Sequence, residues 1–186
     1  MKLSKIKKYN ASPKVSIILP HHNNESFVKD SIKSVISQTY KNWELFIVDG
    51  NSNYKSKNII SQFKKNKKIK ITWVKSNNGA GFNRNLGIKK SKSNYIAFID
   101  SDDIWKKNKL KKQIKFMIKN KCDFSYTGYA TMDSNNKILR KINPPLKYNS
   151  ANIFLDETFI TSPRSYNLAE MLSGRNNFIT SFHKHK

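Results

Sequence analysis

Five short apolar runs along the chain predict strands. They are rich in Ile, Val and aromatic residues, and they lie at residues 15–19, 43–48, 69–74, 95–99 and 122–129. The first and fourth, VSIIL and YIAFI, are nearly continuous. Strands covered on both faces of a parallel sheet have this composition, because neither face meets water. We therefore expect a buried, mostly parallel sheet.

Helical periodicity lies between these runs. One apolar stripe runs along residues 24–38, with Asn24 as the expected N-cap, and another runs along 105–120. Weaker helical patterns cover 55–65 and 81–91. Strands that alternate with helices over short connections predict an α/β fold.

Beyond about residue 130 the alternation stops. The sequence predicts a hairpin-like turn, a loop, a short helix and a last strand, at residues 132–139, 143–152, 166–174 and 176–182 respectively. Internal repeats and clear linkers are absent. We expect a basic extension over residues 1–13 and then a single domain over 14–186, with a first half at 14–104 and a second half at 105–186.

Lysine dominates the charge of the chain. There are 36 Lys or Arg residues against 12 Asp or Glu, which gives a formal net charge of +24. Lys is scattered along the whole chain, often beside Asn and Ile, and this favours a compositional bias. Contact with an anionic membrane surface is the second interpretation, and nucleic-acid binding is the third. Because no nucleic-acid-binding motif accompanies the charge, we expect no nucleic-acid partner.

Other features of the composition indicate the cellular compartment of the protein. The single cysteine, Cys122, permits no internal disulfide and lies in an apolar run typical of a core. No stretch reaches the roughly 18 to 20 apolar residues of a membrane-spanning helix. The basic start lacks the apolar segment of a signal peptide. These features favour the cytoplasm, with any peripheral contact at the inner face of the cytoplasmic membrane.

Polar loops follow the first four predicted strands. They begin at Pro20, Asp49, Ser76 and Asp100. In open α/β sheets, ligands bind outside the carboxyl ends of the strands. Because the four loops share that edge, together they predict one binding site.

The fourth loop concentrates acid, with Asp100, Asp102 and Asp103 within four positions. Carboxylate oxygens suit Mg²⁺ or Mn²⁺, which proteins commonly hold with one or two carboxylates and substrate phosphates. Such a cation neutralises charge on a diphosphate leaving group. The alternative is that Asp102 or Asp103 caps the helix from Trp105 onward. Capping accounts for one aspartate, for which Asp103 is the better candidate, but not for three.

These loops carry a set of recognisable motifs. VSIILPHHN resembles a strand followed by Pro-x-Tyr-Asn, with His22 in the Tyr position, and SVISQTY (34–40) resembles a helix ending in Ser-x-x-x-Gln-Thr-Tyr. VDGNS resembles Val-Asp-Asp-Gly-Ser without the second Asp. IDSDD resembles Leu-Asp-x-Asp-Asp. NNGAGFNRNLGI resembles Asn-x-Gly followed by Ala-Arg-Asn-x-Gly, keeping Asn77, Gly79, Arg84, Asn85 and Gly87, with Asn83 in place of a small residue.

With these motifs in order from about Val15 to Asp103, the chain resembles the family 2 glycosyltransferases, which are inverting nucleotide-sugar transferases with the GT-A fold. The resemblance implies a Rossmann-like sheet flanked by helices, with the nucleotide sugar bound in the first half and part of the acceptor site in the second. It implies that Asp49 receives the nucleobase, that Arg84 lies near the diphosphate, that Asp100 lies near the ribose and the metal, and that Asp102 binds the metal directly. The other implied nucleotide-sugar contacts are Pro20, His22, Asn23, Glu25, Asn51, Asn77, Gly79 and Ser101.

Several residues have two interpretations. The glycines of the third loop and the helix after it, Gly79, Gly81 and Gly87, serve either ligand approach or tight turning and helix packing. Asn85 either braces a loop or touches ligand. His21 and His22 either contact the nucleotide or do not. His183 and His185 fit a frayed terminus better than a metal site.

An inverting transfer needs a general base that deprotonates the acceptor hydroxyl. In the family this is an acid at the start of a helix, after a strand resembling NNFITSF. The sequence ends soon after that strand and has no acid beyond Glu170, so the usual general base is expected to be absent. Three explanations stay open: a truncated transferase, a partner chain that supplies the rest, or an unusual base chosen from Asp133, Asp156, Glu157 and Glu170.

The sequence thus predicts a metal-dependent, hexosyltransferase-like enzyme of cell-envelope polysaccharide biosynthesis. It would move a sugar from a nucleotide-diphosphate sugar, with a UDP-sugar favoured, to a surface-glycan or lipid-linked acceptor. The alternative is a truncated or catalytically impaired nucleotide-sugar-binding module that docks on a membrane or a partner.

Overall fold

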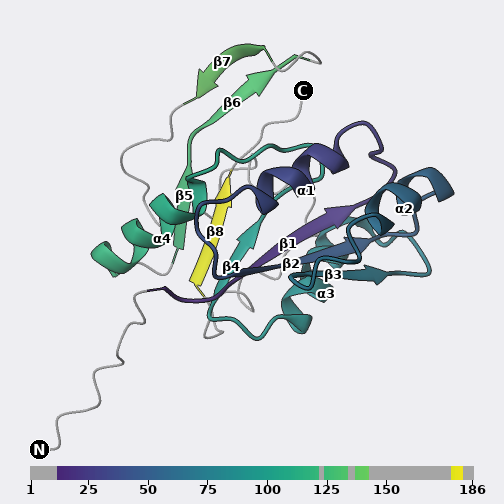
Figure 1. The fold of residues 1–186 in the computed structure, drawn as a ribbon, viewed down its shortest axis with the longest axis horizontal. Helices are drawn as coiled ribbons and strands as arrows, with labels where there is room; N and C mark the ends of the chain where they lie inside the picture. The colour runs from purple at the N-terminus through teal and green to yellow at the C-terminus, as the bar shows by residue number, and fades with distance from the viewer. Residues whose placement is uncertain (1–11, 122–123, 134–136, 143–176, 182–186) are drawn as a thin grey trace, which may run out of the picture.

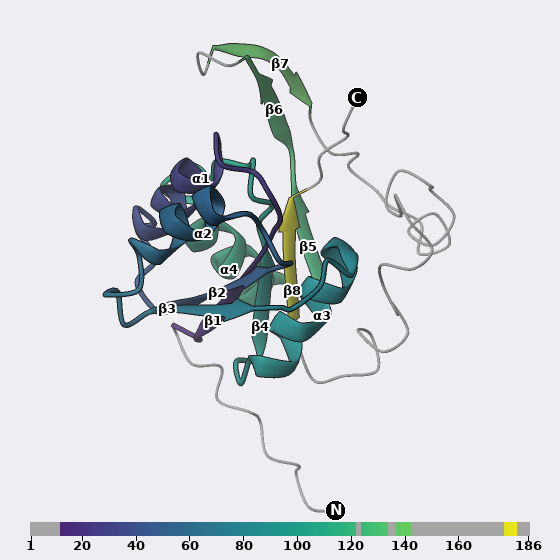
Figure 2. The ribbon, with the colours of Figure 1, turned by 90° about the vertical axis from the view of Figure 1, so that its right-hand side faces the viewer.

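The computed structural model describes residues 12–121, 124–133, 137–142 and 177–181. These residues form a six-stranded sheet flanked by helices, and a two-stranded hairpin that stands apart from it (Figures 1 and 2). The expected features at residues 1–11, Cys122, the loop at 143–152 and the helix at 166–174 lie outside the described residues, as do Asp156, Glu157, Glu170, His183 and His185.

Strands and helices alternate through the first two thirds of the chain, as the sequence predicts. The elements in chain order are β1 (Val15–His21), α1 (Val28–Ile36), β2 (Trp43–Asp49), α2 (Tyr54–Ser61), β3 (Ile69–Trp73), α3 (Gly79–Lys90), β4 (Tyr95–Phe98), α4 (Lys109–Asn120), β5 (Phe124–Thr127), β6 (Tyr129–Met132), β7 (Ile138–Ile142) and β8 (Asn177–Ser181).

The large sheet is parallel throughout its described pairings. Its strand order is β3-β2-β1-β4-β8-β5, and every pair from β3 to β5 runs parallel. The strand expected at 122–129 divides in two, because β5 ends at Thr127 and joins the sheet, whereas β6 begins at Tyr129 and pairs antiparallel with β7. The hairpin-like turn expected at 132–139 is therefore confirmed.

The sheet has a different apolar layer on each face. On one face, Ile17 and Leu19 of β1 pack with Ile32 of α1 and Leu110 of α4. On the other, Ile18 of β1 packs with a smaller cluster that includes Ile88 of α3. Burial of each such side chain contributes about 1.5–3 kcal/mol. The nearly continuous apolar runs are explained by these two layers, which leave the central strands no side open to water.

Glycine allows α3 to lie close to the sheet. A Cβ at Gly87 would lie 2.6 Å from Cγ2 of Ile18, which is too close for any larger residue without a shift. The packing interpretation of Gly87 is therefore confirmed.

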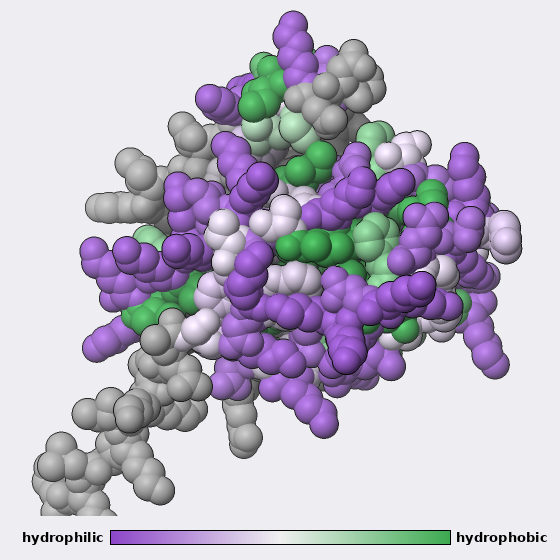
Figure 3. All heavy atoms as spheres, viewed as in Figure 1, coloured by the Kyte–Doolittle hydropathy of each residue, from purple (hydrophilic) through white to green (hydrophobic). Residues whose placement is uncertain are grey.

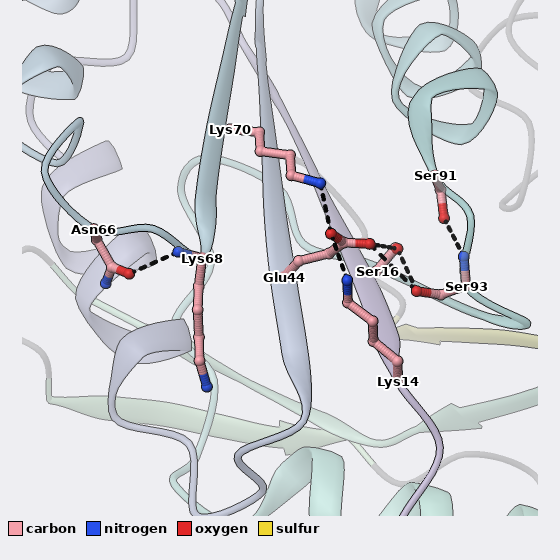
Figure 4. A network of polar contacts seen from close by, with 8 residues as sticks. All are labelled: Lys14, Ser16, Glu44, Asn66, Lys68, Lys70, Ser91 and Ser93. Atoms are coloured by element: carbon pink, nitrogen blue, oxygen red, sulfur yellow. Dashed lines mark hydrogen bonds and ion pairs between the residues drawn. The ribbon is translucent and has the colours of Figure 1, made fainter.

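A charged network closes the amino end of the sheet, away from the polar loops (Figure 4). The buried carboxylate of Glu44 on β2 accepts hydrogen bonds from Lys14 at 2.9 Å, Lys70 at 2.7 Å and Ser16 at 2.8 Å. Burial raises the pKa of Glu44, but the hydrogen bonds from Lys70, Lys14 and Ser16 outweigh it and lower the pKa to about 2. This acid is structural.

The molecular surface is strongly polar where it is visible. Figure 3 shows hydrophilic side chains spread across all the elements in that view rather than gathered over one of them. Within the described part of the chain, no helix has the length and apolar content needed to cross a membrane.

Candidate functional site

The carboxyl ends of β1, β2 and β4 meet at one edge of the sheet. The parallel register sets His21 of β1 directly beside Asp49 of β2, and Ile18 of β1 beside Phe98 of β4. The loops after these strands carry most of the predicted site residues, as the sequence indicates. β1 is two residues longer than its predicted strand, so Pro20 lies within the strand and is buried.

The first and second loops are joined by a set of polar contacts. The backbone amide of Asn23 donates to Oγ of Ser52 at 3.0 Å, and the amide of Asn53 donates to Oδ1 of Asn23 at 2.8 Å. The Nδ2 group of Asn53 donates to Oε1 of Glu25 at 2.5 Å, and this hydrogen bond lowers the pKa of the Glu25 carboxyl. Asn23 and Asn51 both take left-handed backbone angles, with φ of 46° and 60°, which Asn tolerates better than most residues. The two loops thus form one fixed unit.

His22 and His21 have different surroundings. The exposed ring of His22 lies with Nδ1 2.9 Å from the carbonyl oxygen of Gly50 and Nε2 3.2 Å from Nδ2 of Asn23. These two contacts fit the neutral tautomer in which Nδ1 carries the proton. His21 is buried, and burial lowers the pKa of its imidazole although the Asp49 and Glu25 carboxylates oppose the shift.

Asp49 lies at the floor of this edge. Its side chain is fully buried, and Oδ1 accepts from the backbone amide of Ser52 at 2.9 Å, which fixes the turn after β2. Its Oδ2 has no hydrogen-bond partner among the described residues. The same is true of the two ring nitrogens of His21 and of Oδ1 of Asn83. Such buried, unpaired polar atoms are unusual in proteins. These atoms around Asp49 could therefore accept hydrogen bonds from a ligand or donate them to it.

The third loop leads into α3. The amide of Gly79 donates to Oδ1 of Asn77 at 3.0 Å, and Gly79 takes a φ of 85°, a conformation that favours glycine. One turn of α3 further on, the guanidinium of Arg84 forms an ion pair with the carboxylate of Asp100. The sequence predicts both residues at the site, and the structure brings them into contact.

The three aspartates of the fourth loop have three different environments. The Asp100 side chain is 31% exposed and paired with Arg84. Asp102 is exposed and Asp103 is buried. Ser101, between them, accepts a hydrogen bond on Oγ from Nδ2 of Asn24 at 3.0 Å. Asp100 and Asp102 are therefore the carboxylates that a ligand could reach.

Two predicted helix caps are wrong. α4 begins at Lys109, four residues later than expected, and its N-cap is Asn108, so neither Asp102 nor Asp103 caps it. α1 begins at Val28 with Phe27 as its N-cap, so Asn24 does not cap α1 with its side chain. Asp102 and Asp103 lie in the fourth loop before α4, and the side chain of Asn24 contacts that loop at Ser101. The capping alternative for the acidic cluster is therefore excluded.

The donor set fits a hard divalent cation that is shared with a substrate. Among the described residues, no group of three or more His, Cys, Asp or Glu side chains gathers as a complete metal site. Two carboxylates on one loop would supply part of a coordination sphere, and phosphate oxygens would have to complete it. This is how Mg²⁺ is commonly bound beside a nucleotide.

Sequence reasoning missed two features of this region. Lys109 lies with Nζ 4.6 Å from the centroid of the Trp105 ring and donates to Oε1 of Gln113 at 2.5 Å. Burial lowers its pKa to about 7, although Asp103 opposes the shift. Three polar residues on and just after α1 also contact the fourth loop. They are Ser31, Ser34 and Gln38. Two signals in the sequence could have revealed them: their spacing of three and four residues, and the SVISQTY motif that contains Ser34 and Gln38.

The parallel sheet and the polar loops at its carboxyl edge define an α/β domain of the nucleotide-binding type. The model of glycosyl transferase family 2 matches residues 16–175, and the chain belongs to that family.

Known proteins extend this comparison. WfgD of Escherichia coli, a UDP-Glc:alpha-D-GlcNAc-diphosphoundecaprenol beta-1,3-glucosyltransferase, is 41% identical over 133 residues, which cover 72% of this chain and 52% of WfgD. The crystal structure of S. aureus TarS 1-349 has a TM-score of 0.58 at 25% identity, over 62% of this chain and 36% of that one. Its complex with UDP-GlcNAc has a TM-score of 0.62 at 18% identity, over 93% of this chain and 60% of that one. The chain thus spans about half the length of WfgD.

The fold class predicted from the sequence is confirmed. The structural neighbours are glycosyltransferases of the GT-A fold, and the described sheet is parallel and flanked by helices.

Proposed function

We propose that this chain binds a nucleotide-diphosphate sugar, with a UDP-sugar favoured, at the carboxyl edge of β1, β2 and β4. The observation that carries the proposal is the Arg84–Asp100 ion pair beside the exposed Asp102. A diphosphate is the ligand that fits a guanidinium and two carboxylates together, provided that a cation lies between the acids and the phosphates. WfgD uses UDP-Glc by its name, and TarS 1-349 is solved with UDP-GlcNAc.

A divalent cation, Mn²⁺ or Mg²⁺, belongs to this proposal. Asp102 would hold it directly, with Asp100 beside it. When bound, such a cation neutralises the charge that develops on the diphosphate leaving group. The chain's own contribution is to carry the two carboxylates on one loop and to keep Arg84 against Asp100.

The nucleobase would lie over the first and second loops. Pro20, His22, Asn23, Glu25, Asn51, Asn77 and Gly79 surround this part of the edge in the sequence-based assignment, with Asp49 at its floor. The unpaired Oδ2 of Asp49 supports a contact with an N–H group of the nucleobase. Because Asp49 is fully buried, the nucleobase must displace whatever side chains cover it.

The proposed reaction is transfer of a hexose, with inversion at the anomeric carbon, to a lipid-linked or surface-glycan acceptor. The acceptor of WfgD, a diphosphoundecaprenol-linked GlcNAc by its name, supports the lipid-linked class. The general base stays unassigned. Of its candidates, only Asp133 lies in the described part of the chain, where its carboxylate accepts from the amide of Lys137 and closes the β6–β7 turn. The basic surface, with a net charge of +24, would favour contact with an anionic membrane that carries such an acceptor.

Calorimetry tests the donor site before any acceptor is known. UDP, GDP and CDP are titrated into the chain with and without Mn²⁺. We expect UDP to bind, and Mn²⁺ to tighten its binding. In Asp102→Ala the Mn²⁺-dependent gain in UDP affinity should fall by about 10–100-fold. Asp30→Ala removes an exposed acid from the first turn of α1, whose side chain bonds no group of the loops among the described residues, and should behave as wild type. Absence of UDP binding by the wild-type chain would overturn the proposal.

A further inference from the structure

Three buried polar side chains form a row along α1 and the residues just after it. Ser31, Ser34 and Gln38 are 0%, 6% and 0% exposed. Their spacing of three and four residues places them on one face. We call them the α1 polar row. A helix face this polar would be unfavourable inside a protein unless each group had a partner.

The partners of the α1 polar row are backbone groups of residues 100–110. The hydroxyl of Ser31 lies 3.1 Å from the carbonyl oxygen of Asp100 and also donates to the carbonyl of Asp103. Oγ of Ser34 accepts from the amide of Trp105 at 3.1 Å. All of these loop groups belong to the segment that carries the aspartates of the proposed donor site.

Gln38 extends the same pattern to the end of the loop. Its Nε2 donates to the carbonyl of Lys106 at 2.9 Å, and its Oε1 accepts from the amide of Leu110 at 3.1 Å in the first turn of α4. Between Phe98 and Lys109 the chain has no helix or strand, so its backbone groups need partners from elsewhere. The α1 polar row provides several of them, from the first aspartate to the start of α4, beside the bond from the Asp103 amide to the Asp100 carbonyl within the loop.

We infer that Ser31 and Ser34 are positioning residues for cation and diphosphate binding in this chain. The inference rests on the proposed function. The carboxylates of Asp100 and Asp102 repel each other and lie on a loop without regular structure, so their spacing needs an external support. Ser31 fixes the backbone at Asp100 and Asp103, on both sides of Asp102. Ser34 fixes the backbone where the loop turns toward α4. Loss of either hydroxyl should loosen the two carboxylates without removing any group that touches the ligand.

The chain offers a control serine, Ser37, which is exposed and lies just after the last residue of α1. Oγ of Ser37 donates to the carbonyl of Ser34 at 2.9 Å and has no contact with the fourth loop among the described residues. Ser37→Ala therefore removes one serine hydroxyl from the end of α1 and leaves the loop contacts intact. Oγ of Ser34 also donates to a carbonyl three residues earlier, that of Ser31 at 2.7 Å. Any effect of losing that kind of contact should therefore appear in both Ser37→Ala and Ser34→Ala.

The experiment compares Ser31→Ala, Ser34→Ala and Ser37→Ala with the wild-type chain. Mn²⁺ affinity is measured by electron paramagnetic resonance of the free ion, and UDP affinity by calorimetry in saturating Mn²⁺. Amide hydrogen exchange is followed over residues 100–108. We expect Ser31→Ala and Ser34→Ala to lose about tenfold in Mn²⁺ affinity, as for other residues that orient metal ligands, and to exchange faster over the loop. Ser37→Ala should match the wild type in all three measurements.

The outcomes separate this inference from the proposed function. If the wild type binds Mn²⁺ and UDP, but Ser31→Ala and Ser34→Ala bind them as Ser37→Ala does, the positioning role is overturned and the donor site stands. If the wild type binds neither, both proposals fail. Affinities are compared only at temperatures where the circular dichroism of each variant matches the wild type. If Ser31→Ala does not fold, Ser34→Ala alone decides, because its lost contact lies at Trp105 rather than at the aspartates.

Discussion

Arg84 on α3 and Asp100 after β4 form an ion pair that joins the third and fourth loops, although they are sixteen residues apart in the chain. The Arg84 side chain is 13% exposed and that of Asp100 is 31% exposed. Both charged groups therefore lie where a ligand phosphate could reach one and a cation the other. The pair thus presents a positive group directly beside the acidic loop.

Replacing Arg84 by Gln should weaken UDP binding by about 1.5–3 kcal/mol, as expected when a charged hydrogen-bonding group is lost. The same change should leave Asp100 without its cationic partner, so Mn²⁺ should bind no more weakly than in the wild type. Calorimetry with UDP and with Mn²⁺ separately checks both statements. A parallel loss of both ligands would instead indicate that Arg84 acts by holding the loop.

Gly50 and Asn83 are predicted to be sterically coupled. A Cβ at position 50 would lie 2.7 Å from Nδ2 of Asn83, so Gly50→Ala should destabilise the fold by about 1–3 kcal/mol. In an Asn83→Ala background the same substitution should be tolerated, because the amide is no longer there. Urea denaturation of the two single variants and the double variant gives the coupling energy, expected to be at least about 1 kcal/mol.

Equal effects of Gly50→Ala in both backgrounds would contradict this coupling. Gly81→Ala, on the same helix as Asn83 and also buried, serves as the comparison for a glycine replaced elsewhere in this region.

Glu44 should make the fold sensitive to acid. Its folded-state pKa of about 2 lies below the ordinary value of 4.5, so the stability it contributes is present above pH 4.5 and is lost as the pH falls toward 2. Glu44→Gln should therefore lose about 1–2 kcal/mol at pH 7 and much less near pH 2. Urea denaturation at several pH values between 2 and 7 measures the difference, and a constant difference over that range would refute the assignment.

Lys109 should give a dependence of the same sign as Glu44, but at higher pH. Its pKa in the folded state is about 7, against 10.5 ordinarily, so the unfolded chain binds the proton more strongly between these values. Stability of the wild type relative to Lys109→Met should rise with pH over that range, by at most about 1.4 kcal/mol per pH unit. The Asp103 carboxylate, the Trp105 ring and Gln113 face this amine. Lys106→Met, at an exposed neighbour, serves as the control for replacing a lysine in this segment.

Much of the fold could be predicted because its signals are local. The runs at 15–19 and 95–99 are buried on both faces, and they became β1 and β4 with the expected parallel pairing. The motifs around Asp49, Arg84 and Asp100 lie at one edge of the sheet because each follows directly after a strand or begins a helix. What failed were the starts of α1 and α4. The side chain of Asn24 contacts Ser101, and backbone groups of residues 100–108 find partners on α1. These long-range contacts leave no periodicity in the sequence.

The same reasoning explains why the unpaired polar atoms near Asp49 were missed. The sequence places His21 in the polar loop after the first strand. In the structure β1 extends to include His21, and its ring is buried. Asn83 stands out in the sequence only as a departure from a small residue. Its proximity to Gly50 depends on how closely α3 approaches β2, and that distance is set by the packing of Gly87 on Ile18.

The position of β8 has a consequence for how the sheet is assembled. Residues 177–181 lie between β4 and β5, and β5 pairs with no other strand among the described residues. During synthesis, β5 would emerge some fifty residues before its neighbour exists. A nascent chain stopped before β8 would therefore have β1 to β4 able to pair but β5 without a partner, with an open edge at β4. Contacts between residues this distant in the chain form slowly, so the step that adds β8 and β5 together should be the last and slowest in folding.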